Sequence, residues 1–137
     1  KSKQALAIAK YNSAKHRAKI KLIKSNLWSK VKGKYELIIA NLPYVPQKIY
    51  YQNKPTLDWE PEMAITDGSK SGLELYKKFI QRLPNFLTPN GQTLMEIDPS
   101  QKKQLLNIVK STVPTATVQA HKDLSNRWRY LTIKLRN

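Results

Sequence analysis

The sequence predicts an α/β fold with helices on both faces of a sheet and an antiparallel hairpin at the end of the chain. Helical and strand patterns alternate along the 137 residues, and the last two predicted strands follow each other without a helix between them. The apolar content of 40% is enough for a modest core. A chain of this length corresponds to about one domain.

The first half of the chain predicts a helix, two strands and a long loop. Ser2 is placed to cap a helix. A short strand is expected at residues 20–23, and the run 35–40 predicts a strand buried on both faces. Residues 45–68 contain three prolines and read as a loop of a length that is usually functional. The apolar residues of the first helix that share one side are Ala5, Leu6, Ile8 and Ala9.

The second half predicts two helices and three strands. Ser71 and Glu74 have the spacing of a capping box, and Asn90-Gly91 predicts a turn into a strand at residues 92–97. Ser100 is placed to cap the second helix. The hairpin strands are expected near residues 116–120 and 128–135. The inward residues of the two helices are Leu73, Tyr76, Phe79, Ile80 and Leu83, then Leu105, Leu106, Ile108 and Val109.

The charge of the chain is high and uneven. The net charge is +16, and residues 1–34 hold ten Lys and one Arg but no acid, which places +11 in the first quarter. Such a segment favours a polyanionic partner, a nucleic acid or a ribosomal surface, that it contacts through solvated lysines. Compositional bias explains the lysines equally well, so both interpretations stay open.

Several classes of site are excluded by composition. The chain has no Cys, and His16 and His121 are far apart, so thiol chemistry is excluded and no metal site is expected. No apolar run approaches the roughly 20 residues of a membrane span, and no signal-peptide pattern opens the chain. We therefore expect a cytoplasmic protein without membrane contact.

The four residues Asn41-Leu42-Pro43-Tyr44 directly follow the strand predicted at 35–40. In open α/β sheets, ligands bind at the carboxyl ends of the strands. A strand also ends here for a simple structural reason, because proline cannot donate to the ladder. The four residues resemble the Asn-Pro-Pro-Tyr motif of methyltransferases that use S-adenosylmethionine to modify a planar nitrogen.

The flanking sequence resembles one family over nearly the whole chain. "WEPEMAI", "SGLELYKKF", "LMEIDPSQ" and "DLSNRWRYLTIKL" follow the motif, and "ALAIAKYNS" and "KSNLW" precede it. Their order and spacing are similar to those of the protein-(glutamine) methyltransferases of peptide chain release factors, the HemK/PrmC family. The resemblance implies a Rossmann-like class I methyltransferase fold that depends on S-adenosylmethionine (SAM).

The resemblance also implies roles for the motif residues. The Asn41 side-chain oxygen and the Leu42 carbonyl would accept the two hydrogens of a glutamine amide, while the Tyr44 ring packs on that flat group. Pro43 biases Leu42 toward an extended backbone, which aims its carbonyl into the cleft. Leu42 itself replaces the first proline of the family's motif, so the turn is expected to be less preorganised.

Other residues receive substrate or cofactor roles by the same resemblance. Glu60 and Pro61 stand in the loop expected to contact the release factor. Asn26, Leu27 and Asn41 are the residues expected to bind S-adenosylmethionine, with Asn26 in place of an expected Asp.

The family's Gly-rich cofactor loop has no counterpart among the four glycines of this chain. We therefore expect an N-terminally truncated catalytic domain that lacks its first two strands. Residues 1–34 would form a basic helix and strand, and residues 35–137 would hold the motif strand, the substrate loop and the C-terminal half of the sheet. The chain alone is then expected to be inactive.

Two alternatives stay open from the residues. A nucleic-acid methyltransferase that acts on the exocyclic nitrogen of adenine would suit the same motif and the positive charge. An inactive piece that binds nucleic acid or a partner through its lysines is the other.

Glu96 is a candidate for organising the site. In the run 127–130, where cations alternate with aromatic residues, strand alternation is expected to bury one set.

Overall fold

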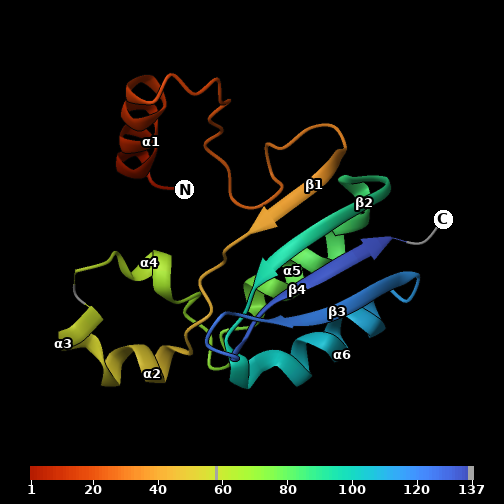
Figure 1. Ribbon diagram of the computed structural model, residues 1–137. Coiled ribbons are helices and arrows are strands. Elements are labelled where there is room, and N and C mark those ends of the chain that lie inside the picture. The colour runs from red at the N-terminus through yellow and green to blue at the C-terminus, as the bar shows by residue number, and fades with distance from the viewer. Residues whose placement is uncertain (58, 136–137) are drawn as a thin grey trace. The chain divides into compact units, whose positions relative to one another are not determined.

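The computed structural model describes residues 1–57 and 59–135 (Figure 1). The chain divides into two compact units, Lys1–Gly33 and Lys34–Asn137. Each unit is described below by itself. No helix among the described residues is long and apolar enough to cross a membrane.

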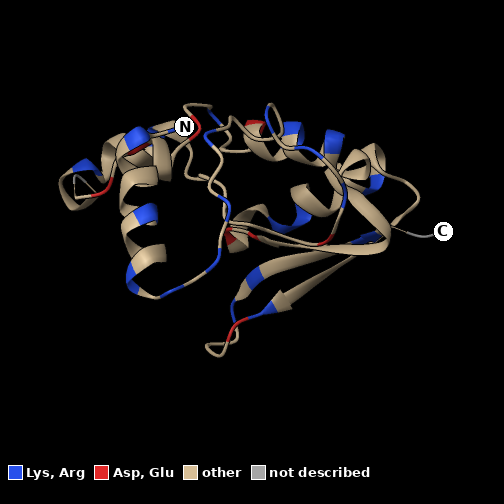
Figure 2. Ribbon diagram, turned by 90° about the horizontal axis from the view of Figure 1, so that it is seen from above, with Lys and Arg blue, Asp and Glu red and all other residues tan. Residues whose placement is uncertain are grey.

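The first unit contains helix α1 (Lys3–Lys15). Its predicted cap is confirmed, because the Ser2 hydroxyl accepts a hydrogen bond of 3.1 Å from the Ala5 amide. No residue of α1 is buried. The helix and the segment that follows it carry Lys and Arg but no acid (Figure 2).

The strand predicted at residues 20–23 is not formed, and the prediction is wrong. Ile20 and Leu22 are exposed, and no described strand pairs with this segment. A strand is stabilised by its ladder partners rather than by its own residues. An apolar triplet interrupted by lysine and without a neighbouring strand therefore stays irregular.

The second unit is built on a four-stranded sheet with the order β1-β2-β4-β3. Its first pair, β1–β2, is parallel, and the other two pairs are antiparallel. The predicted C-terminal hairpin is confirmed as β3 and β4. The strand bounds are Tyr35–Ala40 for β1, Leu87–Glu96 for β2, Ala116–Lys122 for β3 and Trp128–Leu135 for β4.

Strand β1 has the predicted bounds but not the predicted burial. It lies at the edge of the described sheet, with 49% of Leu37 and 73% of Ile39 exposed. Only Ala40 is buried. A strand paired on one side cannot be covered as a central strand would be.

Strand β2 begins five residues earlier than predicted. Tyr35 pairs with Leu87 and Leu37 with Gln92, so β2 advances five positions where β1 advances two. The predicted turn at Asn90-Gly91 lies within this irregularity, where Asn90 has a φ of +66°. The extra residues form a bulge that lets the regular parallel ladder begin at Leu37.

The main helices of the second unit, α5 (Glu74–Arg82) and α6 (Lys102–Thr112), pack against each other on one face of the sheet (Figure 1). Helices on both faces were expected, but these two share a face. Of the predicted inward residues of α6, Leu105 and Val109 are buried, whereas Leu106 and Ile108 are half-buried. The sheet residues beneath the helices include Thr93, Met95, Leu131 and Ile133.

The predicted loop 45–68 holds three short helices. They are α2 (Gln47–Gln52), α3 (Lys54–Leu57) and α4 (Glu62–Ile65). Pro46 and Pro61 stand directly before α2 and α4, where a missing amide hydrogen costs nothing. The prolines that suggested an irregular loop therefore begin helical turns.

Carboxylates rather than the predicted serines accept the amide hydrogens at the start of α5 and at the start of the 3₁₀ turn before α6. Asp67 accepts hydrogen bonds from the amides of Glu74 (2.8 Å) and Leu75 (3.1 Å) at the start of α5. Asp98 accepts one from the Ser100 amide (2.8 Å) in the 3₁₀ turn Pro99–Gln101 before α6. A carboxylate is favoured there because its negative charge faces the positive end of the helix dipole.

Removal of the Asp67 carboxylate should destabilise the second unit. Burial raises the pKa of Asp67, but hydrogen bonds from Ser69, Leu75 and Glu74 outweigh it, so the pKa lies below its ordinary value. We expect Asp67→Ala to lower the free energy of unfolding by about 1 kcal/mol at neutral pH. The difference should shrink as the pH falls below about 4, because the charged form is then lost. Urea unfolding of both proteins at neutral pH and below about pH 4 measures this difference in the free energy of unfolding. An equal loss of stability at both pH values would contradict the prediction.

Candidate functional site

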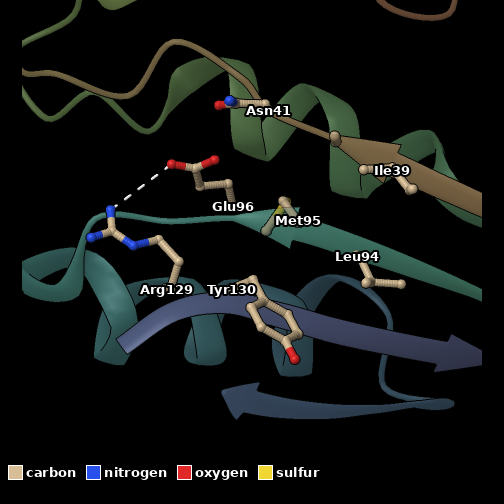
Figure 3. A pocket seen from close by; sticks show the side chains of 8 residues that line it. Ile39, Asn41, Leu94, Met95, Glu96, Arg129 and Tyr130 are labelled. Atoms are coloured by element: carbon tan, nitrogen blue, oxygen red, sulfur yellow. Dashed lines mark ion pairs between the residues drawn. The ribbon is translucent and has the colours of Figure 1, made fainter. Parts of the chain in front are cut away.

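The motif residues Asn41, Leu42, Pro43 and Tyr44 lie at the carboxyl end of β1, as the sequence predicts. A shallow pocket of about 200 Å³ opens beside them (Figure 3). It collects residues from the ends of β1, β2 and β4, which are neighbours in the sheet. The pocket is lined by Ile39, Ala40, Asn41, Leu94, Met95, Glu96, Arg129 and Tyr130.

The Asn41 side chain is exposed at the mouth of this pocket. Figure 3 shows its amide on the same side as the Glu96 carboxylate. In the part of the chain that the structure describes, no group forms a hydrogen bond with the Asn41 amide. Its oxygen and nitrogen are therefore both available to a ligand.

The Tyr44 side chain is half-buried and anchored to β2. Its hydroxyl donates a hydrogen bond of 3.3 Å to the Glu96 carboxylate. Burial, followed by the negative charge of Glu96, raises the pKa of the Tyr44 hydroxyl. Tyr44 is therefore neutral at physiological pH and acts as a donor to Glu96, which lines the pocket.

Glu96 belongs to a chain of charges that runs from the pocket to the β3–β4 turn. Arg129 lies with Nη1 3.9 Å from the Glu96 carboxylate, drawn as a dashed line in Figure 3. Its Nε donates a hydrogen bond of 3.0 Å to Asp123. That bond is the main cause that raises the pKa of Arg129. The prediction that Glu96 organises the site stays a prediction, and the structure adds Arg129 beside it.

The alternating segment 127–130 is not buried as predicted. All four side chains are exposed or half-buried. Arg129 lines the pocket, and Trp128 lies beneath the Lys102 ammonium, 3.7 Å from the ring centroid. The prediction failed because the buried residues of β4, Leu131 and Ile133, come after this segment, which leads into the strand at Trp128.

The backbone that follows the motif is tied to distant parts of the loop. The amide of Val45 donates to the Ile65 carbonyl at 3.0 Å, and the amide of Gln47 donates to the Ser69 carbonyl at 2.9 Å. The buried Tyr76 hydroxyl donates to the backbone carbonyl of Glu96 at 2.6 Å. These bonds fix the backbone after the motif and the backbone of Glu96, a residue that lines the pocket. Sequence patterns gave no signal for them, because each bond joins segments that are far apart along the chain.

The predicted substrate residues Glu60 and Pro61 are exposed on the segment that leads into α4. Neither lines the pocket beside Asn41. The end of α4, Ile65, is the part of this loop that joins the motif. A substrate contact for Glu60 and Pro61 stays a prediction.

The predicted cofactor residues Asn26 and Leu27 lie in the first unit. The Asn26 amide donates to the Ser29 hydroxyl at 3.2 Å, and the Leu27 carbonyl accepts from the Ser25 hydroxyl at 2.8 Å. Leu27 has a φ of +48°, which makes this a tight turn. Their cofactor role stays a prediction.

No family model matches the chain. Curated relatives do match it. It is 27% identical to the release factor glutamine methyltransferase of Lactococcus lactis, over 97% of this chain and 49% of that protein. Identity to the enzyme of the same name from Bifidobacterium longum is 33%, over 72% of this chain and 33% of that protein. Identity to the ribosomal protein uL3 glutamine methyltransferase of Francisella tularensis is 34%, over 73% of this chain and 32% of that protein.

Solved structures show the same fold. A methyltransferase from Pyrococcus furiosus superposes with a TM-score of 0.68 at 21% identity, over 99% of this chain and 59% of that one. A Streptococcus mutans protein in complex with SAH gives a TM-score of 0.63 at 16% identity, over 98% and 72%. The α/β fold of class I methyltransferases is thus confirmed.

The chain spans between about a third and a half of the length of the curated relatives it matches. The matches cover most of this chain and are consistent with a C-terminal part of those proteins. The chain is therefore related in sequence to the release factor glutamine methyltransferases and has the class I methyltransferase fold.

Proposed function

We propose that the chain is the C-terminal part of an S-adenosylmethionine-dependent enzyme that methylates the side-chain amide nitrogen of glutamine in a peptide chain release factor. The observation that carries this proposal is the exposed Asn41 amide at the carboxyl end of β1, beside the pocket formed with β2 and β4. The names of the curated relatives support the substrate class.

The motif supplies what this chemistry requires. An amide nitrogen is a poor nucleophile, so it must be held in line with the methyl group while positive charge develops on it. The Asn41 oxygen and the Leu42 carbonyl would accept the two amide hydrogens, and the Tyr44 ring would pack on the flat group. The Glu96 carboxylate holds Tyr44 by its hydroxyl. These residues would orient the nitrogen without any change in their own protonation, and the proton that the methylated amide must lose would pass to water.

S-adenosylmethionine would supply an electrophilic methyl group on a sulfonium. A solved structural neighbour contains SAH, which supports this cofactor. The pocket beside Asn41 has about 200 Å³, which is below the roughly 300–1,000 Å³ of complete ligand sites. The unpaired Asn41 amide that lines it is able to pair with the reacting amide of a substrate. Asn41 is the residue of the second unit that we propose holds the cofactor. Asn26 and Leu27, in the first unit, keep the cofactor role that the family resemblance predicts.

A second candidate substrate is a glutamine side chain in a ribosomal protein. The 34% identity to the uL3 glutamine methyltransferase is the observation that favours it. Both substrates present the same amide to the same motif, so Asn41 to Tyr44 would act identically on each. Selection between them would come from parts of the complete protein that contact the substrate surface.

The test is methyl transfer from labelled S-adenosylmethionine by the complete protein. A release factor, ribosomal protein uL3, a DNA duplex and an RNA are offered in parallel. We expect label on a glutamine of the release factor, and replacement of that glutamine by Asn should abolish the label. Label on adenine would overturn the proposal, and label on uL3 alone would move it to the second substrate. RNA binding without transfer would favour the interpretation of the lysine-rich residues 1–34 as a polyanion surface.

Restoring the family's first motif proline should preserve or improve transfer. Leu42→Pro keeps the carbonyl that accepts the substrate hydrogen and fixes φ at about −65°. The turn is then more rigid before the substrate binds. Initial rates with the release factor measure this effect. A large loss of rate in a folded variant would show that the backbone at Leu42 follows a path that proline cannot adopt.

A further inference from the structure

The side chain of Gln101 joins two loops that meet behind the motif. Its Nε2 donates a hydrogen bond of 2.9 Å to the Tyr44 carbonyl and another of 2.9 Å to the Ser71 carbonyl. The residue is only 5% exposed. One amide group therefore links the end of the motif to the loop before α5, across 57 and 30 positions of the chain.

The orientation of this amide is fixed by its partners. Two carbonyl oxygens face one atom, so that atom must be the nitrogen, which has two hydrogens to donate. The opposite atom, Oε1 of Gln101, is buried and has no hydrogen-bond partner within the described residues. An unpartnered buried oxygen costs about 1–3 kcal/mol. Gln101 thus sits where only the donor end of its amide is used.

The Tyr44 carbonyl is held from a second direction by Gly72. A Cβ at Gly72 would collide with the carbonyl oxygen and carbon of Tyr44, so the two backbones are in close contact. The same Cβ would lie 3.0 Å from the Gln101 nitrogen. Because Gly72 has no side chain, the Tyr44 carbonyl fits against its backbone, and Gln101 donates a hydrogen bond to the same carbonyl. Together the two residues fix the end of the motif.

We propose that Gln101 is a positioning residue for methyl transfer, acting through the Tyr44 backbone. This inference rests on the proposed function, because Tyr44 is the motif residue that it holds. With the Tyr44 carbonyl fixed, the Tyr44 ring and the Leu42 carbonyl are presented to the substrate amide in one geometry. Misplacement of reacting groups by about 1 Å costs about 10²-fold in rate.

Gln101→Glu tests the proposal with almost no change in volume. The variant places a carboxylate against two carbonyl oxygens and removes both donors. In the complete protein we expect kcat to fall by about 10²-fold, while the affinity for S-adenosylmethionine stays within a few-fold. A protonated carboxyl can donate to one carbonyl, so the deficit relative to wild type should shrink as the pH is lowered from about 8 to about 6.

The matched control is Gln104→Glu, which makes the same change on the exposed side of α6. It should leave kcat unchanged. If Gln101→Glu does not fold, Gln101→Met removes the donors without adding charge and should show the same loss of kcat. A kcat within about twofold of wild type for a folded Gln101 variant would overturn the proposal.

Amide hydrogen exchange gives a readout that does not depend on activity. The Val45 amide is bonded to Ile65 at the end of α4, and the Gln47 amide is bonded to Ser69, two residues before the Ser71 carbonyl that Gln101 contacts. In Gln101→Glu, their exchange in the 137-residue chain should accelerate, whereas the Val109 amide in α6 should not change. Unchanged exchange at Val45 and Gln47 would also overturn the proposal. If wild type transfers no methyl to glutamine but the exchange result holds, the proposed function fails and the positioning contact stands.

Discussion

Asn41→Ala should lower the rate of methyl transfer by the complete protein by about 10²–10³-fold, while its affinity for S-adenosylmethionine should fall by only a few-fold, because Asn41 would supply only one of the contacts to the cofactor. The Asn41 oxygen is the one side-chain acceptor that the motif offers to the substrate amide, and the described residues leave it unpaired. Removing one preorganised hydrogen-bond group from a developing charge typically costs 10²–10³-fold in kcat. The exposed position means that the loss should come without destabilisation.

Single-turnover transfer and calorimetry with the cofactor measure the two quantities separately. Asn107→Ala is the matched control, because Asn107 is an exposed asparagine on α6, away from the motif. It should retain wild-type rates. Near-normal turnover of Asn41→Ala would show that the motif has been assigned wrongly, whichever substrate is used.

Features that depend on neighbouring residues could be predicted from the sequence. The bounds of β1 follow from its apolar run and the proline that ends it, and the hairpin β3–β4 follows from two β-rich segments joined by a short turn. The helix at residues 3–15 follows from the Ser2 cap. Each of these signals lies within a few positions of the element that it predicts.

Features that depend on distant partners were missed. Ile20 to Ile23 lack a ladder partner in the described residues, and β1 is paired with β2 alone, so neither has the predicted structure or burial. Asp67 caps α5 across seven positions, a spacing that no capping motif describes. The periodicity of apolar residues in the sequence indicates which residues could be buried. Whether they are buried depends on the element that packs or pairs with them.

The site divides in the same way. Asn41 to Tyr44 could be placed from sequence, because the motif is contiguous and follows a strand. Arg129 and Gln101 could not, since each reaches the motif from a separate element. Gln101 gave one local hint only: it stands at the start of a helix, where a buried polar side chain needs a partner outside the helix.

Gly72→Ala should destabilise the chain far more than the same change at Gly68. Both glycines have a positive φ, +68° and +79°, so an alanine costs about 1–2 kcal/mol at each. At Gly68 nothing lies within 4 Å of the added carbon, and the backbone cost is the whole effect. At Gly72 the carbon collides with the Tyr44 carbonyl, which cannot rotate away as a side chain would.

Relief of that collision must displace either the loop before α5 or the end of the motif. Overpacking of this kind adds about 1–3 kcal/mol, so the free energy of unfolding should fall by about 2–5 kcal/mol for Gly72→Ala. Urea unfolding of the two variants of the chain gives the difference directly. In the complete protein, Gly68→Ala should keep wild-type transfer, whereas Gly72→Ala should lose it even at temperatures where it remains folded. Equal destabilisation by the two substitutions would mean that the Tyr44 carbonyl does not lie against Gly72. The backbone contact inferred to fix the end of the motif would then be wrong.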